Sequence, residues 1–179
     1  NLKSLLIYNN QLTSLPESFG DLDELEQLKI GNNNLNLLPE SLGNLHRLEE
    51  LDLINNNLQS LPDNFDELSD LYHLNLFNNQ LQNFLPNINE LQSLEVLNLE
   101  NNQIEFITDG ICNIYENLSY LALNNNNICP PYPECLSETD IGIQNLDNCE
   151  MCDTSFIWIS EIPNNVINED QSHCFYEND

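Results

Sequence analysis

Apolar residues recur along the chain in a pattern that repeats about every 23 residues. Each copy reads L-x-x-L-x-[LI]-x-x-N-x-[LI], as in LEELDLINNNL from residue 48. We number the positions of a repeat from its first leucine, and these leucines are Leu2, Leu25, Leu48, Leu71, Leu94 and Leu118. The L-x-L portion alternates with period two, so it predicts a short strand rather than a helix.

A single copy cannot bury its own leucines, whereas a stack of copies buries them together as a continuous core. Strands of successive copies then pair in parallel about 4.8 Å apart, so six strands span roughly 25 Å. Pro16, Pro39 and Pro62 are expected to start the segments opposite the strands, because proline suits the first turn of a helix. Pro86 stands one residue later in its repeat and predicts a local kink.

This pattern resembles the leucine-rich-repeat family, specifically the class with repeats near 23 residues and an LPxxφxxL second half, where φ is apolar. The resemblance covers residues 1 to about 128. It implies an α/β-type solenoid, a horseshoe with a parallel concave sheet and an irregular or short-helical convex side. The chain opens within a repeat, which is typical of a mature or trimmed chain.

The ninth position of every repeat is asparagine, which the family uses as an internal ladder. A side-chain amide can satisfy backbone groups where the chain leaves the strand and turns inward, which an apolar side chain cannot do. We therefore interpret this column as structural and not as a ligand site. Its members are Asn10, Asn33, Asn56, Asn79, Asn102 and Asn126.

All six cysteines lie beyond residue 110, an arrangement that indicates a disulfide-bonded cap in an oxidising compartment. A solenoid must close its open end, and the prolines of residues 130–133 end the repeat pattern after Ile128. We expect a solenoid over residues 1–128, a cap over 129–152, and an acidic tail or cap extension over 153–179.

The spacing of the cysteines narrows the fifteen pairings that six cysteines allow. Cys135 stands one residue before the counterpart of Cys112 in the next coil, and adjacent coils lie about 5 Å apart, within disulfide range. This register predicts a disulfide between Cys112 and Cys135. Elimination then leaves Cys129–Cys149 and Cys152–Cys174.

A metal site explains the cysteines near the carboxyl end less well than disulfides do, and the support for glycosylation is weak. Cys149, Cys152, His173 and Cys174 could supply four zinc ligands, but adjacent ligands are awkward and the other thiols would be left over. The sequence contains no D-x-[DN]-x-[DN]-G calcium loop. Asn117 begins the triplet Asn-Leu-Ser of an N-glycosylation acceptor, a motif that arises by chance in an asparagine-rich chain. We expect no metal and no other cofactor.

Acidic residues number 30 against 3 basic ones, for a formal net charge of −27. Nucleic acid and anionic membrane surfaces are disfavoured as partners, because both need clustered Lys and Arg. No apolar run reaches the roughly 18 residues of a transmembrane helix. The charge serves solubility or attracts a basic partner or divalent cations.

Catalysis is not expected, because the repeat pattern places the three histidines on different parts of the molecule, where they form no simple catalytic constellation. His46 falls on the convex side, His173 in the tail, and only His73 on the concave face. No nucleophile elbow, phosphate loop or metal motif accompanies His73.

The outward positions of the strands form the candidate ligand surface. Tyr8, Ile54 and Phe77 are expected to face solvent there, where apolar side chains are unnecessary for the fold and typical of binding hot spots, although exposed apolar residues are also ordinary. Asparagine at the eighth position either helps the turn or offers amides to a glycan or peptide. The candidate ligand-binding residues are Tyr8, Lys29, Glu50, Asp52, Ile54, His73, Phe77, Glu100 and Tyr120.

The sequence therefore predicts a secreted or cell-surface binding module that recognises a protein or peptide ligand on its concave face. A basic segment of the ligand would complement the acidic surface. The prediction includes no nucleic-acid partner and no membrane insertion. Glycan binding and a spacer role within a larger surface protein are the alternatives.

Overall fold

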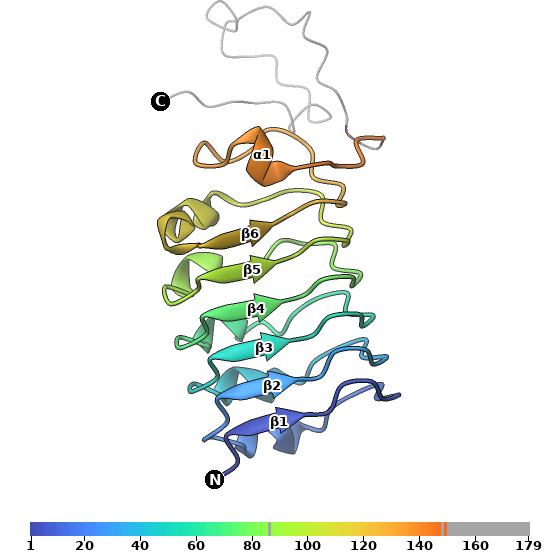
Figure 1. Ribbon diagram of the computed structural model, residues 1–179, viewed down its shortest axis with the longest axis vertical. Coiled ribbons are helices and arrows are strands. Elements are labelled where there is room, and N and C mark those ends of the chain that lie inside the picture. Colours follow the sequence, from blue (N-terminus) through green and yellow to red (C-terminus); the bar gives the residue numbers. More distant parts are fainter. Residues whose placement is uncertain (86, 148, 150–179) are drawn as a thin grey trace, which may run out of the picture. The chain divides into compact units, whose positions relative to one another are not determined.

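Six short strands form one parallel sheet in chain order in the computed structural model, which describes residues 1–85, 87–147 and 149 (Figure 1). The strands pair in the register of the repeat, so that Leu28 lies beside Leu51 and Leu51 beside Leu74. The predicted parallel sheet is confirmed. The strands are β1 (Ser4–Leu6), β2 (Gln27–Lys29), β3 (Glu50–Asp52), β4 (His73–Asn75), β5 (Val96–Asn98) and β6 (Tyr120–Ala122).

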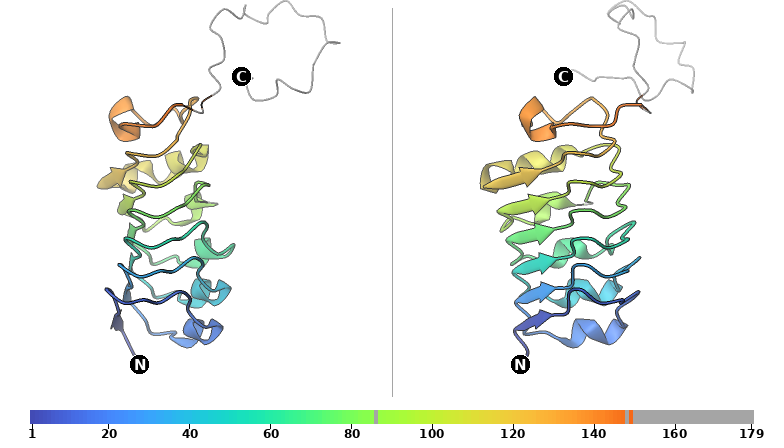
Figure 2. Two further views of the ribbon diagram at one scale, coloured as in Figure 1. Left: turned by 90° about the vertical axis from the view of Figure 1, so that its right-hand side faces the viewer. Right: turned by 45° about the vertical axis from the view of Figure 1, so that its right-hand side comes forward.

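The second half of each of the first five repeats forms one or two short 3₁₀ helices behind the sheet (Figure 2). Pro16 and Pro39 directly precede the first two helices, with φ of −74° and −68°, values that the proline ring imposes. In the third repeat the helix begins three residues after Pro62, and the kink expected at Pro86 falls outside the described residues. The helices are η1 (Glu17–Asp21), η2 (Glu40–Asn44), η3 (Phe65–Glu67), η4 (Ile88–Glu90), η5 (Asp109–Asn113) and η6 (Tyr115–Asn117).

The core lies between the sheet and the 3₁₀ helices. The repeated apolar positions are fully buried from the second to the fifth repeat, as Leu25, Leu28 and Ile30 show at 0% exposure, whereas Leu118 and Leu121 of the sixth repeat are partly buried. Each such side chain contributes roughly 1.5–3 kcal/mol when removed from water. Leu2 in the first repeat is 43% exposed, which shows that a coil buries its leucines only where neighbouring coils cover both sides.

The ninth-position asparagines bind adjacent coils together. Asn56 donates from Nδ2 to the carbonyl of Leu53 in its own coil at 3.0 Å and to that of Ile30 in the preceding coil at 3.2 Å. Its Oδ1 accepts the N–H of Leu35 at 3.0 Å. Each amide thus satisfies three buried backbone groups, which is the structural role expected of the column. The same bonding recurs at Asn33, Asn79, Asn102 and Asn126.

The eighth-position asparagines make the turn out of each strand. All six, from Asn9 to Asn125, have φ between 54° and 58°, a left-handed conformation that asparagine tolerates better than most residues. Their side chains also bond to one another, with Asn55 donating to Asn32 at 2.6 Å and Asn78 donating to Asn55 at 2.7 Å. The role of these residues in the turn therefore explains why asparagine occupies the eighth position of every repeat.

A degenerate seventh coil follows the sixth repeat, which the sequence pattern after Ile128 does not predict. Helix α1 (Glu138–Ile141) takes the place of a strand, and Ile141 is buried in the core. Gln144 occupies the ladder position: its Nε2 donates to the carbonyls of Leu123 at 2.8 Å and Ile141 at 2.5 Å, and its Oε1 accepts the N–H of Ile128 at 3.4 Å. The ladder thus continues for one more coil through a longer amide.

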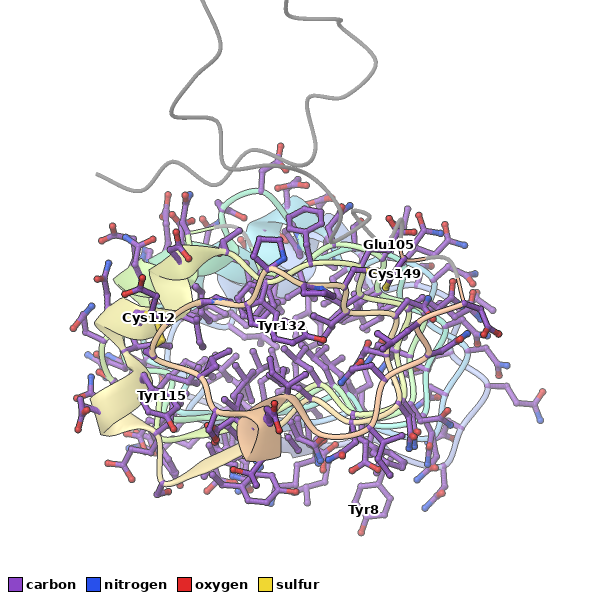
Figure 3. All side chains as sticks on the ribbon, turned by 90° about the horizontal axis from the view of Figure 1, so that it is seen from above. Tyr8, Glu105, Cys112, Tyr115, Tyr132 and Cys149 are labelled. Carbon is purple, nitrogen blue, oxygen red and sulfur yellow. A yellow bond between two sulfur atoms is a disulfide. The ribbon has the colours of Figure 1, made fainter. Side chains whose placement is uncertain are left out.

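A disulfide joins the end of the sixth repeat, directly before the seventh coil, to the fifth repeat. Cys112 in η5 bonds to Cys135, with Cα atoms 5.5 Å apart, and the predicted pair is confirmed (Figure 3). Cys129 and Cys149 are each disulfide-bonded, while their pairing with each other stays a prediction. Cys152, Cys174 and the expected tail over 153–179 lie outside the described residues. The described residues up to 147 belong to one compact unit, so the repeats and the cap residues 129–147 share a single core.

Replacing Cys112 and Cys135 together with serine is expected to lower the free energy of unfolding by about 2–5 kcal/mol, because the bond closes a long loop in the unfolded chain. Thermal unfolding measures this loss, and hydrogen exchange should show loosening first in residues 129–147. Each single substitution should cost as much as the double one, since either breaks the same bond. Unchanged thermal stability would show that the bond contributes nothing to the cap.

Replacing Asn56 with alanine is expected to destabilise the solenoid by about 3 kcal/mol or more, because each buried backbone group left without a partner costs about 1–3 kcal/mol. Asn10 provides a matched control at the same repeat position. It is exposed, and its side chain donates only to the carbonyls of Ile7 and Tyr8 in its own coil, so its replacement with alanine should cost about 1 kcal/mol or less. Urea unfolding compares the two variants, and equal losses would argue against the ladder.

Candidate ligand-binding face

The outward side chains of the strands and of the two residues after each strand form what we call the sheet face. Within β2 to β5 the middle residue is buried and the two flanking residues are half-buried, as the period of a strand requires. All nine residues predicted to bind a ligand stand at these outward positions. The structure therefore gathers them on one surface, although several are already engaged within the chain.

Glu50 is the centre of a hydrogen-bonded network across β2, β3 and β4. It accepts the Tyr72 hydroxyl at 2.6 Å and the Gln27 amide at 2.7 Å, and the Lys29 ammonium lies at 3.2 Å. The bond from Tyr72, supported by those from Gln27 and Lys29, lowers the pKa of Glu50 to about 2 even though partial burial opposes the shift. The same bond raises the pKa of Tyr72 to about 12. Glu50 is thus a fixed charge whose oxygens are occupied by its own chain.

The fifth position of repeats 3 to 5 has a positioning role that sequence reasoning missed. An Asp or Asn there accepts the backbone N–H two residues ahead, which fixes the direction of the seventh-position side chain. The recurrence of Asp or Asn at this position was the available signal, because short polar side chains favour such local bonds. Asp52, Asn75 and Asn98 accept the N–H groups of Ile54 at 3.0 Å, Phe77 at 3.2 Å and Glu100 at 3.0 Å, respectively.

Several apolar side chains stand on the sheet face, and some of them are less exposed to solvent than the sequence predicts. Tyr8 is 51% exposed and projects from the sheet side of the coil (Figure 3), and Tyr120 is 49% exposed. The sequence predicts that Ile54 and Phe77 face solvent, but both side chains are half-buried. Ile54 is covered because it lies over Gly31, where an added Cβ would come within 2.4 Å of its Cγ2. The absence of a side chain at Gly31 thus makes room for Ile54.

The histidines lie apart in the described part of the chain. His73 contacts the ring of Tyr72 edge to face, with ring centres 6.5 Å apart, whereas His46 lies 3.3 Å from the Glu67 carbonyl near η3. His173 falls outside the described residues. Within residues 1–85, 87–147 and 149, no three or more His, Cys, Asp or Glu side chains are grouped to hold a metal ion. No helix of that part is long and apolar enough to cross a membrane.

An open hollow of about 760 Å³ adjoins the sheet face at the amino-terminal ends of the strands, and we call it the acidic groove. Tyr72 connects the two surfaces, because it lines the groove while its hydroxyl bonds to Glu50 on the sheet face. Sequence reasoning missed this groove, since its lining comes from residues about one repeat apart. The lining residues are Glu49, Asp70, Tyr72, Gln92, Ser93, Glu95 and Asn117.

Each of the three basic side chains of the protein pairs with a glutamate that does not line this groove. Lys3 pairs with Glu26, Arg47 lies 2.5 Å from Glu24, and Lys29 pairs with Glu50. These pairs neutralise acidic side chains in the first three repeats. None of these three ion pairs involves a carboxylate that lines the acidic groove.

The family profile described as a leucine-rich repeat region matches residues 1–166, well beyond residue 128, where the sequence pattern ends. No curated protein sequence matches the chain. Among solved structures, a leucine-rich-repeat protein of Leptospira interrogans is 34% identical, with a TM-score of 0.69 over 74% of this chain and 33% of that one.

Two plant receptors are similar to the chain to the same degree. The leucine-rich-repeat ectodomain of the receptor kinase GASSHO1/SCHENGEN3 from Arabidopsis thaliana, solved with CASPARIAN STRIP INTEGRITY FACTOR 2, is 33% identical, with a TM-score of 0.69 over 74% of this chain and 16% of that one. The plant peptide hormone receptor RGFR1, solved with RGF2, is 34% identical, with a TM-score of 0.66 over 73% of this chain and 22% of that one.

The chain spans about a third or less of the length of these three solved proteins. The profile nevertheless covers residues 1–166 of 179. The coils, the parallel sheet and the asparagine ladder agree with that match, and the chain belongs to the leucine-rich-repeat family.

Proposed function

We propose that the chain is an extracellular or cell-surface binding module whose sheet face recognises a protein or peptide ligand. The observation that carries the proposal is the row of apolar side chains on an otherwise polar face. The fold needs the inward leucines and the ladder asparagines, but it does not need Tyr8, Tyr120 or Leu6, which are 51%, 49% and 52% exposed. Large exposed apolar side chains within a polar rim are typical of protein-binding surfaces.

The related structures support this class of function. The ectodomain of GASSHO1/SCHENGEN3 and the receptor RGFR1 are both solved in complex with a ligand, and RGFR1 is described as a peptide hormone receptor. The bonded cysteines support the location, because disulfides persist in oxidising compartments outside the cytosol. The sheet face is therefore the surface on which a ligand of this chain is sought.

The residues of the sheet face divide into anchors and supports. Phe77 and Ile54 are the central anchors, because their partial burial holds them in place and less side-chain freedom is lost on binding. The carboxylate of Asp52 accepts the backbone N–H of Ile54 and so positions this residue. The ion pair of Glu50 and Lys29 is a fixed polar group on the same face. Tyr8, His73, Glu100 and Tyr120 extend the same surface along the coils.

Replacing Phe77 with alanine is expected to weaken ligand binding by about 2 kcal/mol, roughly thirtyfold in Kd, if its ring fills a pocket on the ligand. Phe106 provides a matched control, because it is a 50% exposed phenylalanine between β5 and η5, off the sheet face. Partners captured on the immobilised chain from its native surroundings are then titrated against wild type, Phe77→Ala, Ile54→Ala and Phe106→Ala.

Binding should fall for the two sheet-face variants and hold for Phe106→Ala. A partner whose affinity ignores both Phe77→Ala and Ile54→Ala would show that the sheet face is not the binding surface. Urea unfolding of each variant separates lost binding from lost stability.

A further inference from the structure

The two ends of the strands present different chemistry to a ligand on the sheet face. Beyond their carboxyl ends stand the apolar side chains of Tyr8, Ile54 and Phe77. At their amino ends lies the acidic groove, with exposed Glu49 and Glu95. A ligand that runs along the strands would therefore meet a negative surface at one end and an apolar surface at the other.

The repeat itself shows what the positions of the acidic groove can bind. Glu49 and Glu95 stand at the second position of their repeats, the position at which Glu26 binds the Lys3 ammonium in the second repeat. Asp70 directly precedes the first leucine of its repeat, as Glu24 does, and Glu24 binds the Arg47 guanidinium at 2.5 Å. Equivalent carboxylates thus hold cationic side chains on the same edge of the solenoid, supplied there by the chain itself.

Tyr72 adds a second feature suited to a cation. Tyr72 lines the acidic groove, and its hydroxyl is held by Glu50 at 2.6 Å, which restricts the movement of its ring. A guanidinium or ammonium over the face of such a ring is attracted by its π electrons. The groove therefore combines carboxylates, an oriented aromatic ring and a hollow of about 760 Å³.

Resting on the proposed function, we propose that the ligand is an extended peptide segment that lies along the strands. Its Lys or Arg side chain occupies the acidic groove, and an apolar side chain contacts Ile54 and Phe77. The second and seventh positions of a repeat are five residues apart in extended chain, roughly 17 Å. The basic and apolar residues of the ligand are therefore about five residues apart.

Two synthetic ten-residue peptides of equal composition test this spacing by calorimetry. Both carry two arginines and two leucines among serines and glycines. In the first peptide the arginines precede the leucines by about five residues, and in the second they are adjacent. The first peptide should bind wild type about tenfold more tightly, because only it reaches both surfaces at once. Equal affinities, or no binding of the first peptide, would overturn the proposal.

Charge-neutral variants test the groove with the same first peptide. Glu49→Gln with Glu95→Gln should weaken binding about tenfold, because two partly exposed ion pairs are lost. The control Asp21→Asn with Glu67→Gln removes the same charge from exposed positions on η1 and η3 and should change the affinity by no more than about twofold. Equal weakening by both double variants would mean general attraction to an acidic protein and would overturn the proposal.

The Phe77→Ala variant separates this proposal from the function on which it rests. Weakening by Phe77→Ala but not by Glu49→Gln with Glu95→Gln would leave the sheet face as the binding surface and refute the groove. Indifference to all of these substitutions would refute both the groove and the sheet face. Weakening by both kinds of variant, with the control unchanged, supports the ligand placed along the strands.

Discussion

Every coil of this solenoid must turn its backbone into the core, and the rest of the structure depends on how the buried backbone groups are satisfied there. The ladder amides do so by bonding three backbone groups in two coils, as Asn56 does with Leu53, Ile30 and Leu35. Because each amide joins neighbouring coils, it also fixes their spacing and register. The leucines then stack in line, and the strands pair in parallel. The cap extends this arrangement, since Gln144 continues the ladder into the seventh coil.

This arrangement separates the residues that make the fold from those that are free to bind. Inward leucines, eighth-position turns and ninth-position amides are the same in nearly every repeat, because each coil solves the same packing problem. The outward positions change from coil to coil and include both fixed and free groups. Glu50 and Asp52 are held by their own chain, whereas Tyr8 and Tyr120 are about half exposed. The proposed ligand binding therefore belongs to the sheet face and its edges, whose residues can change without changing the repeat scaffold.

The repeated features could be predicted from the sequence because they follow from one periodicity. The sheet, the ladder and the Cys112–Cys135 bond all depend on residues one repeat apart. Other features could not be predicted, because they depend on exceptions or on three-dimensional proximity. The seventh coil cannot be recognised in the sequence because Leu136 follows Leu118 by 18 residues instead of 23 and because Gln144 stands where the other repeats have asparagine. Ile54 packs over Gly31 of the preceding coil, and the acidic groove is lined by residues of several coils. The sequence of a single repeat reveals neither feature.

The central claim is that the ladder makes the repeats one cooperative unit, and native-state hydrogen exchange tests it most directly. The N–H groups of Leu35, Leu58 and Leu81 donate to the ladder side chains of the following coils. If the claim holds, these three groups exchange only through unfolding of the whole solenoid, with equal protection that matches the free energy of unfolding. Exchange of these groups as fast as that of exposed Thr13, or with protection that differs from coil to coil, would contradict it.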